Sequence, residues 1–171
     1  MTTIETQPKG GTLSQKHLGL LMQYTIEAYK TFQKLAENLP NPMAAIMFKQ
    51  FAEDEREARD LIEAKIASLA DVRVHVTLGG DLLFQDILEG SLSYRETTEF
   101  LVSRERTMEK KLTEWRNASG VRDRNFLTYL IGTKRAHAVE LERELELLQL
   151  DPDWFRREDA ERRLVHGTSA E

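Results

Sequence analysis

The sequence contains no cysteine, and only four prolines and nine glycines occur among its 171 residues. The lack of cysteine excludes disulfides, thiol catalysis, zinc knuckles and cysteine-ligated iron. Few turn-forming residues, with 40% hydrophobic and 31% charged residues, favour a compact helical protein over a many-turned β protein. The length suits one domain that is large enough to bury a core.

Long apolar runs are also missing. No stretch is long enough to cross a bilayer, and the polar N-terminal segment MTTIETQPKGG lacks the apolar centre of a signal peptide. The net charge of -5 provides no general attraction to nucleic acid or to anionic membranes. We therefore expect a cytoplasmic protein that binds neither nucleic acid nor membrane.

Apolar residues recur at helical spacing in four long segments. The first follows a cap at Thr12 or Ser14 and runs to about Asn38. LPNP at 39–42 breaks the chain, and the second segment, with Asn41 as its N-cap and Pro42 in its first turn, runs to about Ala70. The apolar stripes of these two segments are Leu18, Leu21, Ala28, Phe32, Leu35 and Leu39, then Ala44, Phe48, Phe51, Ala58, Ile62, Ile66 and Leu69.

The third and fourth segments have their own end signals. Ser93 and Glu96 form a capping-box pattern at the start of the third, and NASG at 117–120 closes it. Asp123 is expected to open the fourth, which stops before Asp151. Their inward residues are Tyr94, Leu101, Met108, Leu112 and Trp115, then Leu127, Ile131, His137, Leu141, Leu145 and Leu148.

Residues 71–92 separate the two helix pairs, and we expect a long crossover packed along the bundle, with VRVHV as a short extended segment. The sequence thus predicts an all-α four-helix bundle over 14–150. A flexible leader at 1–13 precedes it, and a short C-terminal helix, WFRREDAERRL, with a tail follows within 151–171. The alternative is an ordinary up-down bundle in which 71–92 is only a loop, although loops that long are uncommon.

Inward positions in the middle of the helices, most of them polar, recur at nearly the same offset in both helix pairs. Thr25 and Glu105 are 80 residues apart, Glu55 and Lys134 are 79 apart, and so are Ala58 and His137. The chain therefore behaves like a duplicated two-helix unit with polar positions in the middle of its helices.

This pattern resembles the ferritin-like superfamily, on its rubrerythrin side. There, each half carries an E-x-x-A-x-x-x-Y helix followed by an E-x-x-H helix. FAEDEREARDL at 51–61 is similar to the A-E-x-E-x-x-H segment, and SYRETTEFLVSRERTMEKKL at 93–112 is similar to the opening of the second half. The resemblance covers roughly 14–148 and implies a ferritin-like bundle, in a family of oxygen and peroxide reduction and of iron oxidation and storage.

The family pattern implies four glutamates and two histidines that hold two irons. This chain keeps three of those ligands, Glu55, Glu105 and His137. It has Thr25 in place of a glutamate, Ala58 in place of a histidine and Lys134 in place of a bridging glutamate.

An ammonium among metal ligands repels the metal and competes for its carboxylates. Two buried carboxylates need a positive partner, and we expect Lys134 to bond Glu55 and Glu105 in place of metal. The first hypothesis is therefore an eroded diiron centre without a cofactor, in a homodimer with a non-catalytic assembly or interaction role.

The second hypothesis keeps a metal. Glu55, Glu105 and His137 form a two-Glu, one-His set suited to Fe or Mn, and thus to an oxidase or peroxidase. Lys134 would then have to move aside. A Schiff base on Lys134 is a further possibility, which the neighbouring carboxylates disfavour because they raise its pKa.

Each of the three residues also has a simpler interpretation. Glu55 lies half-exposed if its helix is slightly rotated, Glu105 forms surface ion pairs within SRERTMEKK, and His137 is an ordinary core histidine. Their coincidence at duplicated positions favours a site over these alternatives.

Overall fold

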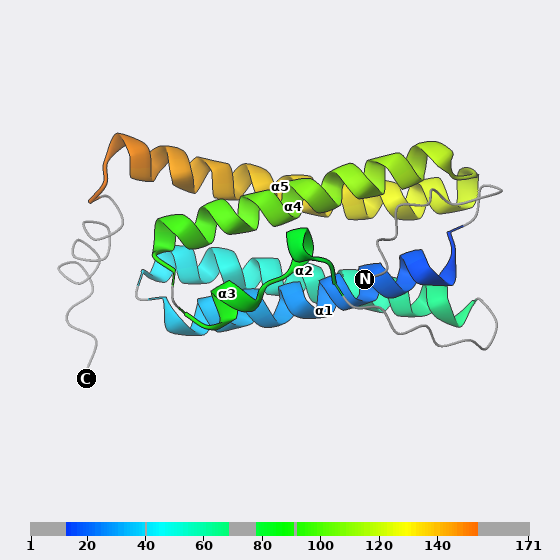
Figure 1. The fold of residues 1–171 in the computed structure, drawn as a ribbon, viewed down its shortest axis with the longest axis horizontal. Coiled ribbons are helices and arrows are strands. Elements are labelled where there is room, and N and C mark those ends of the chain that lie inside the picture. Colours follow the sequence, from blue (N-terminus) through cyan, green and yellow to red (C-terminus); the bar gives the residue numbers. More distant parts are fainter. Residues whose placement is uncertain (1–12, 40, 69–77, 91, 154–171) are drawn as a thin grey trace.

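The computed structural model describes residues 13–39, 41–68, 78–90 and 92–153 (Figure 1). Their helical elements are α1 (Gln15–Asn38), α2 (Pro42–Ala67), the 3-10 turn η2 (Gly80–Leu82), α3 (Gln85–Leu88), α4 (Tyr94–Ala118) and α5 (Val121–Leu150). The described residues contain no strand. The expected extended segment at 72–76 and the expected helix at 154–164 lie outside them.

Side-chain caps start three of the four long helices where the sequence predicts them. Ser14 accepts a hydrogen bond from the backbone N–H of His17, and Asn41 accepts from the backbone two and three residues ahead. Ser93 accepts from the N–H of Glu96 at 3.2 Å and donates to its carboxylate at 3.0 Å. These contacts satisfy N–H groups that the first helical turn leaves unpaired.

The start of α5 differs from the prediction that Asp123 opens it. The helix begins at Val121. Gly120 is its N-cap and makes no side-chain hydrogen bond to the first turn. Asp123 lies in the first turn with its carboxylate committed elsewhere, since it accepts from the backbone N–H of Leu13 at 2.8 Å and pairs with Lys65 at 2.5 Å. Leu13 is itself buried in the core.

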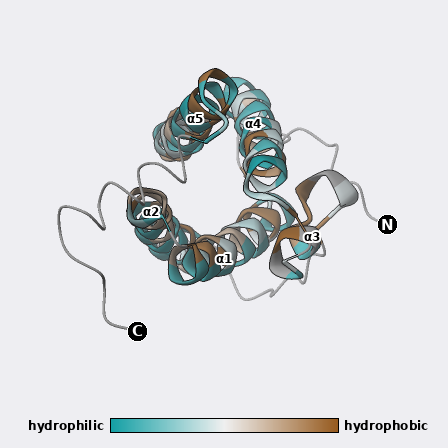
Figure 2. Ribbon diagram, turned by 90° about the vertical axis from the view of Figure 1, so that its left-hand side faces the viewer, coloured by the Kyte–Doolittle hydropathy of each residue, from teal (hydrophilic) through white to brown (hydrophobic). Residues whose placement is uncertain are grey.

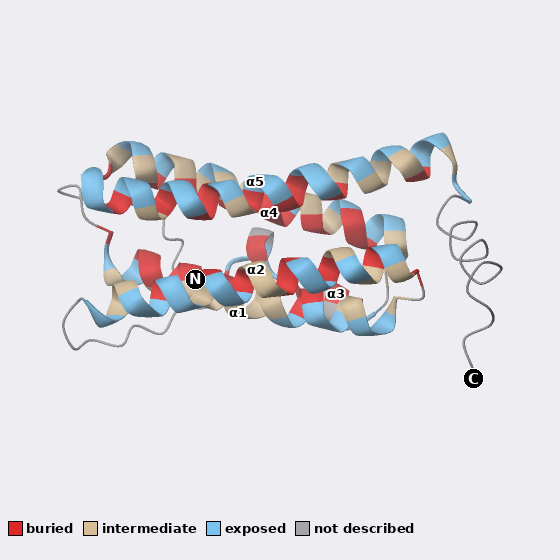
Figure 3. Cartoon of the chain, turned by 180° about the vertical axis from the view of Figure 1, so that it is seen from behind, coloured by how far each residue is buried: buried red, intermediate tan, exposed pale blue. Residues whose placement is uncertain are grey.

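The four long helices form a bundle of two pairs, which confirms the predicted all-α fold. α1 packs along α2, and α4 packs along α5, while the two pairs touch each other far less (Figures 1 and 2). Buried residues lie on the helix faces that point into the bundle (Figure 3). Five residues of the predicted stripes are only partly buried: Leu35, Leu39, Ile66, Tyr94 and Leu145.

The described part of the crossover, 78–90, packs against the bundle as predicted. α3 lies beside α1 (Figure 2), and Leu82, Phe84 and Ile87 are buried. The guanidinium of Arg104 on α4 donates to the carbonyl of Leu83 at 2.8 Å, which anchors this segment to the second pair. No described helix has the length and apolarity that a membrane span requires.

Candidate functional site

Four charged side chains meet inside the bundle, halfway along the helices. Glu55 comes from α2, Glu105 from α4, and Lys134 and His137 from consecutive turns of α5. None of the four residues is more than 2% exposed. They occupy four of the six duplicated positions that the sequence singled out, so the structure brings these predicted site residues together.

Lys134 lies between the two carboxylates. Its ammonium donates a hydrogen bond to Glu55 Oε1 and lies 3.6 Å from Glu105 Oε2. The aromatic ring of Tyr24 on α1 covers it, with Nζ 4.8 Å from the ring centroid. The predicted pairing of Lys134 with both carboxylates is therefore present in the structure.

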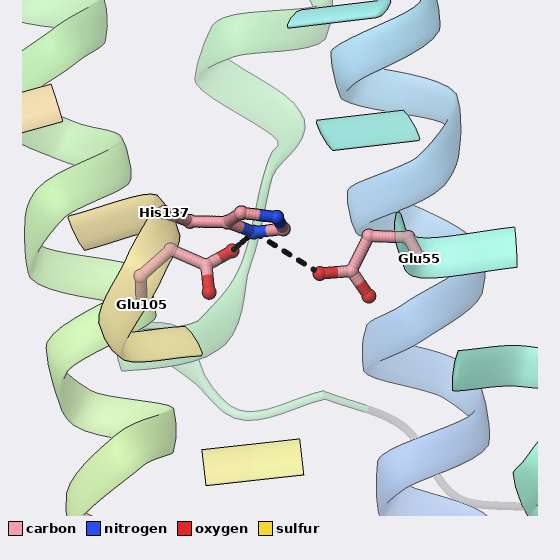
Figure 4. A group of neighbouring side chains, drawn as sticks. All are labelled: Glu55, Glu105 and His137. Atoms are coloured by element: carbon pink, nitrogen blue, oxygen red, sulfur yellow. Dashed lines mark ion pairs between the residues drawn. The ribbon is translucent and has the colours of Figure 1, made fainter. Parts of the chain in front are cut away.

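His137 is held by its outer nitrogen and turns its inner nitrogen toward the carboxylates. Nε2 is 2.9 Å from Asp54 Oδ2, and the ring stacks on Phe51 with centroids 4.1 Å apart. Nδ1 lies 3.6 Å from Glu55 Oε1 and 3.9 Å from Glu105 Oε1 (Figure 4). These separations are too long for hydrogen bonds, so Nδ1 takes part through charge alone.

The remaining two duplicated positions carry small neutral side chains. Thr25 is 2% exposed and follows Tyr24 on α1, and Ala58 is 1% exposed one turn after Glu55 on α2. Both face the interior as predicted, and neither contributes a charge. The first helix pair therefore supplies one charged residue at these positions, while the second supplies three.

Several buried polar atoms around Lys134 have no hydrogen-bond partner among the described residues. They are Tyr24 Oη, Glu55 Oε2, both carboxylate oxygens of Glu105 and His137 Nδ1. Buried polar atoms normally find a partner, because an unpaired one keeps its full desolvation cost. Here the attraction between opposite charges offsets part of that cost.

The two carboxylates respond differently to the same burial. Burial raises the pKa of Glu55, and the attraction of Lys134 offsets only part of the rise. Burial also acts to raise the pKa of Glu105, but Lys134 and His137 together bring it below its ordinary value. For Tyr24, burial and the two neighbouring carboxylates raise the pKa well above its ordinary value.

The two cations are stabilised in their charged forms. Burial acts to lower the pKa of Lys134, but Glu105 and Glu55 outweigh it and leave the pKa above its ordinary value. Burial likewise opposes the charge of His137, yet the hydrogen bond with Asp54 and the nearby Glu105 raise its pKa to about 9. At neutral pH, Lys134 and His137 therefore place two positive charges beside the two buried carboxyl groups.

A diiron centre of the six-ligand kind does not fit these residues. Three of its ligand positions hold Thr25, Ala58 and Lys134, and the ammonium of Lys134 already engages the carboxylates. Within the described part of the chain, one group of three possible ligands remains, Glu55, Glu105 and His137, and one ligand atom from each lies within 4.8 Å of the others.

Two members of the site were not predicted from the sequence. Asp54, which binds His137, lies in the acidic run EDERE, where the sequence does not distinguish it from the other acidic residues, Glu53 and Glu57. Tyr24 on α1, whose ring covers Lys134, is the other. Its helical spacing from Leu21 and Ala28 on the apolar stripe of α1 is the signal that places its ring at the centre.

No protein-family model, curated protein or solved structure matches this chain. The structure by itself shows an all-α four-helix bundle with a possible Glu-Glu-His group. Functional inference therefore depends on the chemistry of the buried cluster.

Proposed function

We propose that this protein is a ferritin-like bundle in which an internal ion cluster replaces a diiron centre, and that it has a non-catalytic role in assembly or protein interaction. One observation carries the proposal: Lys134 donates a hydrogen bond to Glu55 and lies 3.6 Å from Glu105. The positive charge that a metal would supply is supplied by a side chain of the protein.

Electrostatics supports this assignment. Burying two carboxylates without compensation costs several kcal/mol for each ion. Lys134 and His137 provide two positive charges beside these carboxylates, inside the same low-dielectric region. A divalent cation entering this cluster would have to displace Lys134 and remove the proton from His137, and both steps oppose binding.

The proposed assembly is a homodimer. Most of the described apolar side chains that are at least 40% exposed lie on two helices, at Met43, Ile46 and Leu61 of α2 and at Val121, Tyr129, Val139 and Leu150 of α5. Burial of such side chains in a contact between copies would be favourable. Sedimentation that gives only a monomer at high protein concentration would contradict the dimer.

Metal analysis tests the ion-cluster proposal directly. The wild-type protein, purified without chelator and exposed to Fe(II), Mn(II) and Zn(II), is expected to hold no stoichiometric metal. Lys134→Glu removes the cation and adds a carboxylate, so it is expected to bind metal. Lys30→Glu makes the same charge change at an exposed site on α1 and is expected to behave like the wild type.

A second candidate function is a metal-dependent oxidase or peroxidase that uses Glu55, Glu105 and His137 with Fe or Mn. The geometry of His137 favours it, because Asp54 holds Nε2 and leaves Nδ1 directed at the two carboxylates. Histidines that bind metals are commonly oriented in this way by a second carboxylate. Near-stoichiometric metal in the wild type that is lost in Glu55→Ala or His137→Ala would favour this function.

A further inference from the structure

We propose that Lys134 and Glu55 form an intramolecular isopeptide bond, in which Lys134 Nζ is joined to Glu55 Cδ and the cross-link ties α2 to α5. The inference rests on the proposed function in one respect, because Lys134 must occupy the site in place of metal. It goes further by assigning the lysine a covalent reaction with its neighbour.

The reacting groups are already in contact. Lys134 Nζ donates a hydrogen bond to an oxygen of the Glu55 carboxyl group, so the amine lies beside the carbon that it would attack. The two groups belong to rigid helices, and their separation along the chain is 79 residues. Holding two reactants together in this way replaces a bimolecular encounter with an intramolecular one and removes much of its entropic cost.

The surroundings exclude water, which otherwise favours separate charged groups. The side chains of Lys134 and Glu55 are 3% and 0% exposed. In a low-dielectric interior an ion pair loses its hydration, while a neutral amide costs much less to bury. Condensation would therefore convert a costly buried ion pair into an uncharged group.

A second carboxylate lies beside the amine. Glu105 Oε2 is 3.6 Å from Lys134 Nζ, and neither Glu105 oxygen has a hydrogen-bond partner among the described residues. Glu105 is thus positioned to take a proton from the amine and return it to the leaving oxygen. The ring of Tyr24 shields the same ammonium at 4.8 Å.

The reaction balances without an oxidant or reductant. One proton moves along the hydrogen bond from Lys134 to Glu55, leaving an amine and a carboxylic acid. The amine attacks Cδ, the C–N bond forms, and the C–O bond to the hydroxyl breaks. A second amine proton passes through Glu105 to that hydroxyl, which leaves as water, and Glu105 ends as the carboxylate it was.

The ion pair between Lys65 and Asp123 provides an internal comparison. It also joins α2 to α5, with Nζ and Oδ1 2.5 Å apart, but the Lys65 side chain is 22% exposed. Solvent at this pair favours the charged groups over an amide. Both pairs have a lysine in contact with a carboxylate, but only the Lys134 pair is completely buried with a second carboxylate beside it.

Intact-mass spectrometry of the full chain, unfolded before injection, tests the proposal. After incubation of the folded protein, the expected mass is lower than the sequence mass by one water molecule. Digestion is then expected to yield one branched peptide that contains both Lys134 and Glu55. A mass equal to that of the sequence after prolonged incubation, with no branched peptide, would overturn the proposal.

Three variants locate the reaction. Lys134→Arg keeps the positive charge but removes the nucleophile, and Glu105→Gln removes the proton carrier; both are expected to retain helical circular dichroism and the full sequence mass. Lys65→Met, the matched control, is expected to retain the loss of one water. If the wild type binds no metal and also keeps the full sequence mass, the ion-cluster proposal is supported and only the cross-link is contradicted.

Discussion

The two helix pairs share a plan but differ in what they bring to the centre. At the three duplicated positions, α1 and α2 supply Thr25, Glu55 and Ala58, whereas α4 and α5 supply Glu105, Lys134 and His137. The first pair therefore contributes one charge and the second contributes three. Opposite charges from the two helix pairs therefore meet at the centre of the bundle, although the pairs touch each other at few other places.

The largest expected effect comes from removing the cation that joins the pairs. Lys134→Met leaves Glu55 and Glu105 buried without their main partner. Loss of one member of a buried ion pair costs about 3–5 kcal/mol, and urea denaturation is expected to show a decrease in the free energy of unfolding of that size. The decrease is expected whether the Lys134–Glu55 contact is ionic or covalent.

A matched control for that variant is Lys30→Met, which removes an exposed lysine whose partner lies 3.8 Å away on the same helix. Its expected effect is below about 1 kcal/mol, because solvent screens the pair. Equal losses in the two variants would contradict the assignment of Lys134 as the charge that the cluster requires.

The pH dependence of stability tests the second cation. The pKa of His137 is raised in the folded protein from 6.5 to about 9 by Asp54 and Glu105, against the effect of burial. Its proton therefore stabilises the fold fully below about pH 6.5, and this contribution is lost as the pH rises through about 9. The expected contribution is on the order of 3 kcal/mol.

His137→Gln provides the reference for that measurement. The difference in unfolding free energy between wild type and variant, followed against pH, isolates the contribution of the His137 proton. The titrating groups around it, which both proteins share, are Asp54 and Glu55 on α2, Glu105 on α4 and Lys134 on α5. A difference that stays constant across this pH range would show that His137 is neutral in the folded protein.

A smaller effect is expected from the residue that supports His137 from the first pair. Asp54→Asn removes the charged partner of Nε2 and is expected to lower the pKa of His137 from about 9 toward 6.5. The loss of stability at neutral pH is expected to be about 1 kcal/mol, since Asp54 is partly exposed. NMR titration of the His137 ring measures the shift.

The control for Asp54→Asn is Asp60→Asn, on the exposed side of the same helix. It is expected to leave the titration of His137 unchanged. A wild-type titration curve in Asp54→Asn would mean that the hydrogen bond to Nε2 does not maintain the charge on His137.

The smallest effects concern the N-caps of the second helix in each pair. Asn41 caps α2 by accepting from two backbone N–H groups, whereas Gly120 caps α5 without a side chain. Asn41→Ala is expected to destabilise the protein by about 1 kcal/mol, and Gly120→Asn to stabilise it by a few tenths. Thermal unfolding of both variants measures this difference, and shifts in the same direction would contradict it.

Much of the fold was predictable because its signals are local. Helical spacing and the caps at Ser14, Asn41 and Ser93 placed the starts of three helices correctly. The predicted start of α5 at Asp123 was wrong. Aspartate often caps helices, but here its carboxylate binds the backbone N–H of Leu13 and the ammonium of Lys65. Whether an aspartate caps its own helix or binds residues far along the chain depends on which groups the folded structure brings near it.

The candidate site was predictable only in part. Repetition of the polar positions identified Glu55, Glu105, Lys134 and His137, and the structure brings all four together. The contribution of Asp54 was missed, because contact between α2 and α5 decides which carboxylate of an acidic run reaches His137.

The sequence by itself determined the four amphipathic helices, the duplicated positions and the presence of a lysine among them, since these depend on spacing along the chain. Tertiary structure alone decided how Lys134 divides its contacts between Glu55 and Glu105, and which nitrogen of His137 faces them. The physical reason is that the cost of burying a charge depends on the partners and the water around it, and packing of the two helix pairs determines both.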